Sequence, residues 1–366
     1  MSYRYIIAGG GTGGHIFPAI AIANALTLQD PGCAILFVGA KGKMEMEKVP
    51  SAGYAIEGLD IAGFNRSSLF KNVTLPFKLV KSFFQVRKII SAFKPDAVIG
   101  VGGYSSFPVL RVAQAKGIPT FIHEANSFAG KSNQLLSKKA SIVFTAIDGM
   151  ENYFPKDRIV ISGNPVRKSI VEARVTREEG IRFFGLNPDC TTVLVVGGSL
   201  GAQRVNQAIQ NGLAELERNG IQLIWQTGRP FADQAKKQAQ GKRNVWTGDF
   251  IAQMEYAYAA ADLVVSRAGA MAIAELCVTG KPTLFVPYPY AAEDHQTVNA
   301  MRLVEKHAGL IVKDEEVEAK LIPAILDLAM NREQQAVLQG NILKLAIKNA
   351  DVIVAQKIME QLKGIK

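Results

Sequence analysis

Short apolar runs alternate with helix-like segments along most of this 366-residue chain. The runs are rich in Val, Ile and Leu, and they occupy residues 34–38, 97–101, 120–123, 142–145, 159–161, 193–196, 223–225, 263–266 and 283–287. Continuous apolar strands that alternate with helices are typical of a parallel sheet whose two faces are both covered. The pattern therefore predicts an α/β fold, and from about Glu315 it is helical to the end.

The first apolar run ends in a glycine-rich turn. Residues 6–18 read IIAGGGTGGHIFP and lead into a helix-like segment at 19–26. Such a turn lets backbone N–H groups and a helix N-terminus approach a ligand, which predicts a site for an anionic or hydroxyl-rich molecule. A second apolar run ends in GGSLGA at 197–202. The repeat predicts two similar Rossmann-like halves that face one cleft.

Turn residues in the middle of the chain place a domain boundary near Gly163. The stretch ISGNPVR at 161–167 follows a predicted strand and precedes a polar helix, and the length alone favours about two domains. We predict one domain over 1–163 and a second over 164–343. The C-terminal segment 344–366, within a helical stretch that begins at Leu343, is predicted to pack back on the first domain.

Composition narrows the classes of function. The formal net charge of +10 and a pI near 9.4 indicate an anionic partner, which could be a nucleotide, a nucleic acid or a membrane surface. The three cysteines show no CxxC spacing, so neither a disulfide framework nor a zinc site is expected, and we predict that they are small buried residues. With no long apolar run and no signal peptide in the sequence, we expect a soluble cytoplasmic protein.

A basic apolar segment, defined here as Arg66 to Lys94, carries seven Lys or Arg residues and no acidic residue. Phe and aliphatic residues lie between the basic ones, and 77–93 has the pattern of an amphipathic helix. One interpretation is an ordinary helix that packs into the domain. The other is contact with an anionic membrane surface, to which each basic residue contributes at most about 1 kcal/mol. Nucleic acid is disfavoured because no recognition module is present.

The first turn matches the dinucleotide pattern Gly9-x-Gly11-x-x-Gly14, but the second predicted strand ends without a carboxylate to bind a ribose. An NAD site is therefore disfavoured, while an NADP site remains an alternative because Lys41 stands at the end of that strand. His15 follows the turn, where a neutral imidazole could take a proton from a hydroxyl or could cap the local backbone.

The densest pattern of the second half is ADLVVSRAGAMAIAE at 261–275. It predicts a strand, a turn of small residues and a helix whose first N–H groups bind a diphosphate. Arg267 would add a positive charge there, and Glu275 could accept hydrogen bonds from two ribose hydroxyls. The sequence contains no Asp-x-Asp motif. A diphosphate bound there would then be held by fixed dipoles and cations without a metal ion.

Seven motifs together resemble the MurG family of N-acetylglucosamine transferases. They are GGTGGH at 10–15, GVGGY at 100–104, HEAN at 123–126, GNPVR at 163–167, GGSLGA at 197–202, RAGAMAIAE at 267–275 and DHQTVNA at 294–300. The resemblance covers the whole chain in order. It implies the two-domain glycosyltransferase B fold and an inverting transfer of N-acetylglucosamine from UDP-GlcNAc to the C4 hydroxyl of MurNAc in lipid I, undecaprenyl-pyrophosphoryl-MurNAc-pentapeptide.

The resemblance also implies roles for individual residues. The residues implied for the donor are Thr12, Gly13, Gly14, Asn126, Arg167, Ser199, Ile251, Arg267, Ala270, Met271, Ala272, Glu275 and Gln296. His15 is the implied base, with Glu124 as the alternative proton acceptor. Tyr104 and Glu124 are implied acceptor contacts, and His295 stands where family members often carry glutamine and is a candidate sugar contact. No metal or cofactor is implied.

The family further implies a peripheral enzyme on the cytoplasmic face of the inner membrane, with the basic apolar segment on the anionic lipid surface and cell-wall synthesis proteins as partners. Three alternatives stay open on the sequence. An epimerase of UDP-N-acetylglucosamine would need no lipid acceptor, and an NADP oxidoreductase would need a nicotinamide cofactor. The third alternative is a carrier or scaffold protein with an inactive nucleotide site. It is weakened because the implied donor residues are all present together with His15.

Overall fold

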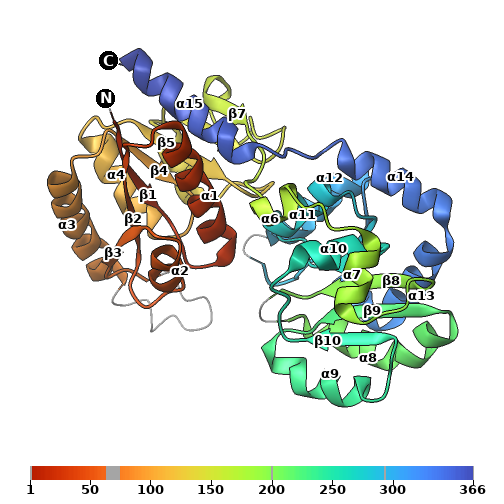
Figure 1. Cartoon of the computed structure of the whole chain (residues 1–366). Coiled ribbons are helices and arrows are strands. Elements are labelled where there is room, and N and C mark those ends of the chain that lie inside the picture. The colour runs from red at the N-terminus through yellow and green to blue at the C-terminus, as the bar shows by residue number, and fades with distance from the viewer. Residues whose placement is uncertain (1, 63–74, 199–200, 292–293, 366) are drawn as a thin grey trace. The chain divides into compact units, whose positions relative to one another are not determined.

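The chain folds into two compact units, described here from a computed structural model that covers residues 2–62, 75–198, 201–291 and 294–365 (Figure 1). Unit 1 comprises Met1–Val166 and Ile347–Lys366, and unit 2 comprises Arg167–Ala346. The crossing from unit 1 to unit 2 thus lies three residues after the predicted Gly163. The reason is local packing, because the Asn164 side chain donates to the Ala125 carbonyl at 3.0 Å and Val166 is buried.

Unit 1 contains a seven-stranded parallel sheet with the order β3-β2-β1-β4-β5-β6-β7. The strands are β1 (Arg4–Ala8), β2 (Ala34–Ala40), β3 (Ala55–Leu59), β4 (Ala97–Gly100), β5 (Thr120–Glu124), β6 (Ile142–Thr145) and β7 (Ile159–Ile161). Each inner strand is an apolar run, as the sequence predicts for a sheet covered on both faces. The edge strand β3 was not predicted, because it alternates exposed and half-buried residues.

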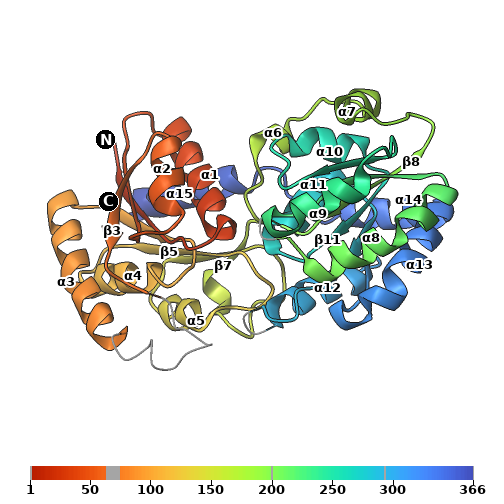
Figure 2. The same cartoon turned by 90° about the horizontal axis from the view of Figure 1, so that it is seen from below.

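Helices cover both faces of this sheet, as Figure 2 shows. They are α1 (Gly13–Gln29), α2 (Glu45–Ser51), α3 (Leu75–Phe93), α4 (Ser106–Ala115), α5 (Lys131–Ser137) and α15 (Ala350–Ile365), with a short 3-10 turn η2 (Lys156–Arg158). Tyr5 and Ile7 of β1 pack in one core with α1 and α15. Their neighbours Ile6 and Ala8 point to the opposite core, with α3 and α4. The alternation along β1 therefore separates two helical layers.

The C-terminal helix α15 belongs to the core of unit 1. Val354, Ala355, Ile358 and Leu362 are buried there against α1 and the sheet. The predicted starting point, Leu343, is wrong, because Leu343 ends α14 (Arg332–Leu343) in unit 2 and lies against Gly280.

Unit 2 contains a six-stranded parallel sheet with the order β10-β9-β8-β11-β12-β13. Its strands are β8 (Thr191–Val196), β9 (Ile221–Gln226), β10 (Val245–Gly248), β11 (Leu263–Ser266), β12 (Thr283–Phe285) and β13 (Leu310–Ile311). Its other elements are α6 (Lys168–Val171), α7 (Arg177–Phe184), α8 (Gln203–Arg218), η3 (Arg229–Phe231), α9 (Ala232–Ala239), α10 (Met254–Ala260), α11 (Ala270–Thr279), α12 (His295–Glu305), η5 (Asp314–Glu316), α13 (Val317–Met330) and α14.

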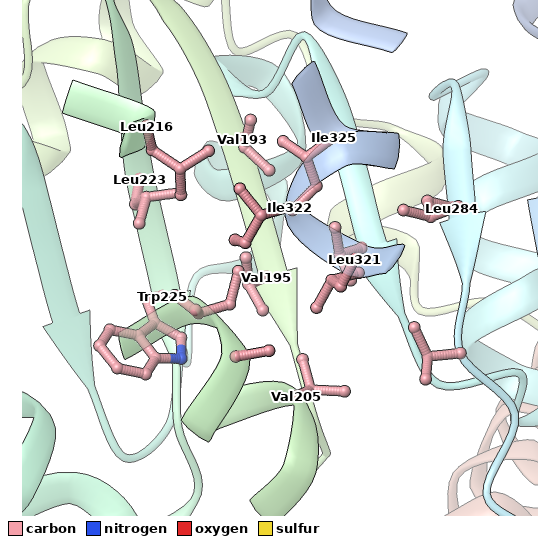
Figure 3. Close-up of a cluster of buried hydrophobic side chains, with 14 of the residues drawn as sticks. Val193, Val195, Val205, Leu216, Leu223, Trp225, Leu284, Leu321, Ile322 and Ile325 are labelled. Carbon is pink, nitrogen blue, oxygen red and sulfur yellow. The ribbon is translucent and has the colours of Figure 1, made fainter. Parts of the chain in front are cut away.

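The core of unit 2 lies between the sheet and helices α8 and α13. Val193 and Val195 of β8 pack with Trp225 of β9 and with Ile322 and Ile325 of α13 (Figure 3). The fully buried Trp225 indole donates from Nε1 to the Asn206 Oδ1 atom at 3.0 Å. A core of this kind gives unit 2 a basis for stability of its own.

Both sheets reverse their strand order next to the first strand of the unit. β1 pairs with β2 on one side and β4 on the other, and β8 pairs likewise with β9 and β11. In open parallel sheets, ligands bind outside the carboxyl ends of the strands at such a reversal. The glycine turn after β1 and the turn after β11 both lie at these positions.

Two smaller expectations have different outcomes. Cys277 is buried as predicted, but Cys33 and Cys190 are only half-buried, so that expectation is wrong for two of the three. Among the described helices, none combines the length and the apolar character needed to cross a bilayer.

Candidate functional site

The glycine turn of unit 1 is packed against the loop that follows β4. Gly10 and Gly11 have backbone φ values of +150° and +90°, which residues other than glycine rarely adopt. The Gly10 N–H points at the Gly102 carbonyl at 3.4 Å. A Cβ atom on Gly103 would lie 2.5 Å from the Gly10 carbonyl oxygen. The two loops approach so closely because glycine stands at each contact.

His15 lies in the first turn of α1, half-buried against this turn. Its Nδ1 atom is 3.2 Å from the Gly10 carbonyl oxygen and 3.4 Å from Thr12 Oγ1. A carbonyl only accepts, so Nδ1 carries the proton in the neutral ring and Nε2 is the basic nitrogen. The ring also lies against Gly102, where a Cβ would be 2.7 Å from Nε2. The backbone contact therefore selects the tautomer that a general base at Nε2 requires.

Gly13 and Gly14 begin α1 immediately after its N-cap residue, Thr12, whose side chain makes no capping hydrogen bond. The first turn of α1 contains no acidic residue. A helix start of this kind suits an anionic group.

Glu124 is buried and its carboxylate is engaged by its own loop. Oε1 accepts from the Asn126 backbone at 3.2 Å, and Oε2 accepts from the Gly130 backbone at 3.2 Å and from Asn133 Nδ2 at 2.8 Å. Burial raises its pKa in spite of these donors. This geometry favours a structural role for Glu124 in shaping the 124–133 loop, and it favours His15 over Glu124 as the proton acceptor.

Two other predicted residues of unit 1 lie near these loops. The Asn126 side chain reaches Glu124 Oε1 at 3.4 Å. Tyr104 follows β4, next to Gly11, and its hydroxyl is buried without a hydrogen-bond partner in the described part of the chain. Burial raises the pKa of this hydroxyl. A buried hydroxyl without a partner is suited to a ligand that supplies one.

In unit 2, the structure brings together Arg167 and Glu275, both predicted from the sequence. Arg167 pairs with Glu275 Oε1 through Nη2 at 2.9 Å and through Nε at 3.1 Å. The buried Tyr258 hydroxyl donates to Glu275 Oε2 at 2.9 Å. Burial raises the pKa of Glu275, and Arg167 opposes that shift. Glu275 is thus a fixed, largely buried acceptor on α11.

Arg267 is anchored at the end of β11. Its Nη1 atom donates to the carbonyls of Val286 and Pro287, each at 3.0 Å, and pairs with Asp314 at 2.6 Å. The guanidinium lies 5.5 Å from the centre of the Tyr288 ring. These contacts fix the Arg267 side chain. Asp314 partly neutralises the positive charge of Arg267, and the sequence did not predict this ion pair.

The predicted diphosphate helix, α11, begins at Ala270 after the extended N-cap residue Gly269 and carries no acidic residue in its first turn. Met271 and Ala272 complete that turn. The Gln296 Oε1 atom accepts from the Tyr288 backbone at 3.0 Å. Gln296 follows His295, the first residue of α12.

Of the remaining predicted residues, Ile251 is buried next to the exposed Phe250. Ser199 lies outside the described residues. Residues 63–74 also lie outside them, and with them Arg66 and the first part of the basic apolar segment.

The described part of the basic apolar segment, residues 75–94, divides into two faces. Val86 and Ile90 of α3 are buried in the sheet core. Phe77 and Phe84 are 78% and 64% exposed. Lys78, Arg87 and Lys88 are also exposed, whereas Lys81 pairs with Asp60 at 2.9 Å. The interpretation as a packed helix therefore holds for one side of α3, while contact of the exposed side with a membrane stays a prediction.

Comparison with known proteins gives the family. The model of the glycosyltransferase family 28 N-terminal domain matches residues 5–145, and that of the C-terminal domain matches residues 192–355. A Parabacteroides distasonis protein named UDP-N-acetylglucosamine–N-acetylmuramyl-(pentapeptide) pyrophosphoryl-undecaprenol N-acetylglucosamine transferase is 51% identical over 355 residues, 96% of each chain. A Cytophaga hutchinsonii protein of the same name is 49% identical over 358 residues, 98% of this chain and 96% of that one.

A solved structure agrees with these relatives. The crystal structure of Acinetobacter baumannii MurG matches with a TM-score of 0.80 and 30% identity, and the match covers 98% of this chain and 99% of that one. The chain belongs to the MurG family. A structure of UDP-N-acetylglucosamine 2-epimerase also matches, with a TM-score of 0.66 at 13% identity, and that likeness shows a shared fold alone.

Three residues of this MurG family member were missed by the sequence analysis. Tyr258 and Asp314 contact the predicted Glu275 and Arg267, and Glu45 contacts the glycine turn. Glu45 and Asp314 stand in charged stretches, KGKMEMEK and KDEE, which are typical of a solvated surface. Their burial comes from the tertiary fold, so the local pattern gives no signal for it. Among the described residues, no group of three or more His, Cys, Asp or Glu is placed to bind a metal ion.

Proposed function

We propose that this chain transfers N-acetylglucosamine from UDP-GlcNAc to the C4 hydroxyl of MurNAc in lipid I and so forms lipid II, with inversion and without a metal ion. The observation that carries the proposal is identity of about half the residues, over nearly the full length, to proteins named for this reaction. The residues that the family resemblance implies for the reaction include His15, Glu275 and Gln296, and all three are present.

The donor site that we propose lies in unit 2. Glu275 accepts hydrogen bonds from the ribose hydroxyls, and Arg167 and Tyr258 fix the orientation of its carboxylate. The start of α11 and Arg267 face the negative charge that develops on the diphosphate as the sugar leaves. Ser199, Ile251 and Gln296 complete the donor set by family resemblance, with His295 as a further sugar contact.

The base that we propose is His15 in unit 1. Its Nε2 atom removes the proton from the C4 hydroxyl while the hydroxyl oxygen bonds to the anomeric carbon and the bond from that carbon to UDP breaks. The Gly10 carbonyl stabilises the imidazolium that forms, because it accepts from Nδ1. Tyr104 and Asn126 are the proposed polar contacts for the acceptor and the donor sugar on this unit.

The acceptor carries a lipid, and the exposed face of α3 offers a surface for it. Phe77, Val80 and Phe84 are exposed beside Lys78, Arg87 and Lys88. Exposed aromatic and basic side chains on one helix fit the interface of an anionic bilayer. We propose that the protein binds peripherally to the cytoplasmic face of the inner membrane through this helix.

The decisive experiment is transfer of labelled N-acetylglucosamine from UDP-GlcNAc to a lipid I analogue in the presence of EDTA. We expect labelled lipid product from the natural chain and a loss of turnover of about 10²–10⁴-fold in His15→Ala, with UDP binding preserved. Absence of product with intact UDP binding would contradict the transferase proposal. Product that requires a divalent cation would contradict the metal-free mechanism.

A further inference from the structure

Glu45 is a buried carboxylate that the proposed mechanism does not yet use. It is the first residue of α2 and is only 1% exposed, although it lies in the charged stretch 41–48. In the described part of the chain, its partners are two backbone amides and no cation. Oε1 accepts from the Ala40 N–H at 3.0 Å, and Oε2 accepts from the Gly11 N–H at 2.8 Å.

The Gly11 amide and the Gly10 carbonyl are the two ends of one peptide group. Glu45 Oε2 accepts from the N–H end at 2.8 Å, and the carbonyl end is 3.2 Å from His15 Nδ1. A single planar peptide thus connects a carboxylate to the imidazole. Hydrogen bonds in such a chain polarise one another, so the carboxylate makes the Gly10 carbonyl a stronger acceptor.

Three glycines, two on loops and Gly39 in strand β2, make room for this arrangement. A Cβ atom on Gly10 would overlap the Glu45 carboxylate, and one on Gly39 would lie 2.5 Å from Glu45 Cγ. On the other side, a Cβ on Gly102 would lie 2.7 Å from the His15 ring. Both ends of the chain of hydrogen bonds are therefore closely packed against backbone, which restricts the positions of the carboxylate and the imidazole.

We propose that Glu45 is a positioning residue that acts on His15 through the Gly10–Gly11 peptide group, an inference that rests on the proposed role of His15 as base. The carboxylate orients the Gly10 carbonyl, which keeps the proton on Nδ1 and so makes Nε2 the nitrogen that takes the proton of the substrate hydroxyl. Its negative charge then favours the imidazolium that forms during transfer. The acidic member of a Ser-His-Asp triad does the same by direct contact.

Three other groups lie near His15 in the described part of the chain, and none of these three is anionic at neutral pH. Thr12 contributes a hydroxyl, and Tyr104 lies beside Gly11 with a pKa raised by burial. His123 interacts electrostatically with His15 but stays neutral, because burial lowers its pKa to about 4. Removal of the Glu45 charge should therefore make the His15 imidazole accept a proton less readily.

The test compares Glu45→Gln with Glu47→Gln, an exposed carboxylate on the same helix. We expect Glu45→Gln to lower kcat by about 10–100-fold, a part of the 10²–10⁴-fold that a general base contributes, with KM for UDP-GlcNAc nearly unchanged. The midpoint of the acid limb of the kcat–pH profile should move down by about half a pH unit, because the imidazolium loses a favourable charge. Glu47→Gln should change neither quantity. An unmoved midpoint in a folded Glu45→Gln variant would overturn the inference.

A double-mutant cycle separates action through His15 from a purely structural effect. In a His15→Ala background, Glu45→Gln should lower the residual rate less than twofold. A loss equal to that in the natural background would overturn the inference. If His15→Ala alone retains the natural kcat, both the base assignment and this inference fail, while product formation by the natural chain still supports the transferase function.

Should Glu45→Gln fail to fold, Glu45→Asp carries the test, because it keeps the charge on a shorter side chain. We expect it to retain the natural acid-limb midpoint and to restore part of the rate. A midpoint shifted by Glu45→Asp would contradict the inference, because the charge is unchanged.

Discussion

His123 shows how far burial changes a single titratable side chain. It lies at the end of β5, fully enclosed, and its Nε2 atom donates to the Gly163 carbonyl at 3.2 Å. Its Nδ1 atom has no partner among the described residues. A proton on Nδ1 would therefore create a buried charge without an acceptor, and burial lowers the pKa of His123 from 6.5 to about 4.

This shift predicts that unit 1 loses stability in mild acid. Below pH 6.5 the unfolded chain protonates His123, whereas the folded chain does so only near pH 4. The contribution of His123 to the free energy of unfolding is therefore fully present above pH 6.5 and is lost as the pH falls toward 4. At pH 5 we expect a loss of about 2 kcal/mol relative to pH 7.5, measured by hydrogen exchange of unit 1 peptides. In His123→Gln, which keeps a donor for Gly163, this component of the pH dependence should be absent.

The matched control is His307→Gln, an exposed histidine of unit 2. It should leave the pH dependence of unit 1 unchanged. Both tryptophans, Trp225 and Trp246, lie in unit 2, so their fluorescence follows that unit in the same samples. An equal loss of stability in His123→Gln and the natural chain would contradict the assignment.

At the scale of elements, α3 combines two kinds of surface on one helix. Its buried side, with Val86 and Ile90, stabilises the sheet core, and its exposed side carries Phe77 and Phe84. Lys81 is committed to Asp60, which also pairs with Lys41 at 3.0 Å. Membrane binding can therefore be tested on the exposed side without disturbing the core or this ion pair.

We predict that a variant with Lys78, Arg87 and Lys88 changed to Gln binds vesicles of anionic phospholipid about 10–100-fold more weakly than the natural chain. Each basic residue contributes at most about 1 kcal/mol at the surface, and salt screens that contribution. Vesicle sedimentation at low and high salt measures the effect. Lys236→Gln/Lys237→Gln on α9 is the control and should bind as the natural chain does. Unchanged vesicle binding by the α3 variant would contradict membrane binding through the exposed face of α3.

The sequence predicts elements well where they are buried and poorly where they lie at an edge. The inner strands and α3 follow directly from their apolar patterns. Strands β3, β10 and β13 were not predicted. β3 alternates exposed and half-buried residues, β10 consists of half-buried residues, and β13 has only two residues. The same limit applies to the site. The pattern identified His15, Arg267 and Glu275, and the family resemblance added Arg167, whereas the tertiary fold brings Glu45, Asp314 and Tyr258 to the neighbourhood of these residues.

At the scale of the whole molecule, the two units have separate sheets and separate cores. A ligand that binds one folded unit stabilises that unit by mass action, by about 2.7 kcal/mol at a hundredfold excess over its Kd. Glu275, Arg267 and α11 all lie in unit 2. UDP alone should therefore act on unit 2 only.

We predict that UDP raises the unfolding midpoint reported by tryptophan fluorescence and slows hydrogen exchange at the β11–α11 turn, without protecting the glycine turn at 9–15. Glu275→Gln should weaken UDP binding by about 1.5–3 kcal/mol, because a charged hydrogen-bond acceptor is lost. Protection of the 9–15 turn by UDP, with none at β11–α11, would place the nucleotide in unit 1 instead.

The position of α15 has a consequence for how the chain acquires its structure during synthesis. The contacts of Val354, Ile358 and Leu362 complete a core whose other strands and helices leave the ribosome some two hundred residues earlier. Unit 2, which is continuous in sequence, can finish folding before unit 1 does. We expect a chain truncated after residue 346 and released from the ribosome to contain a protease-resistant unit 2 and an open, protease-sensitive unit 1. The half of the protein that is made first would then be the last to become native.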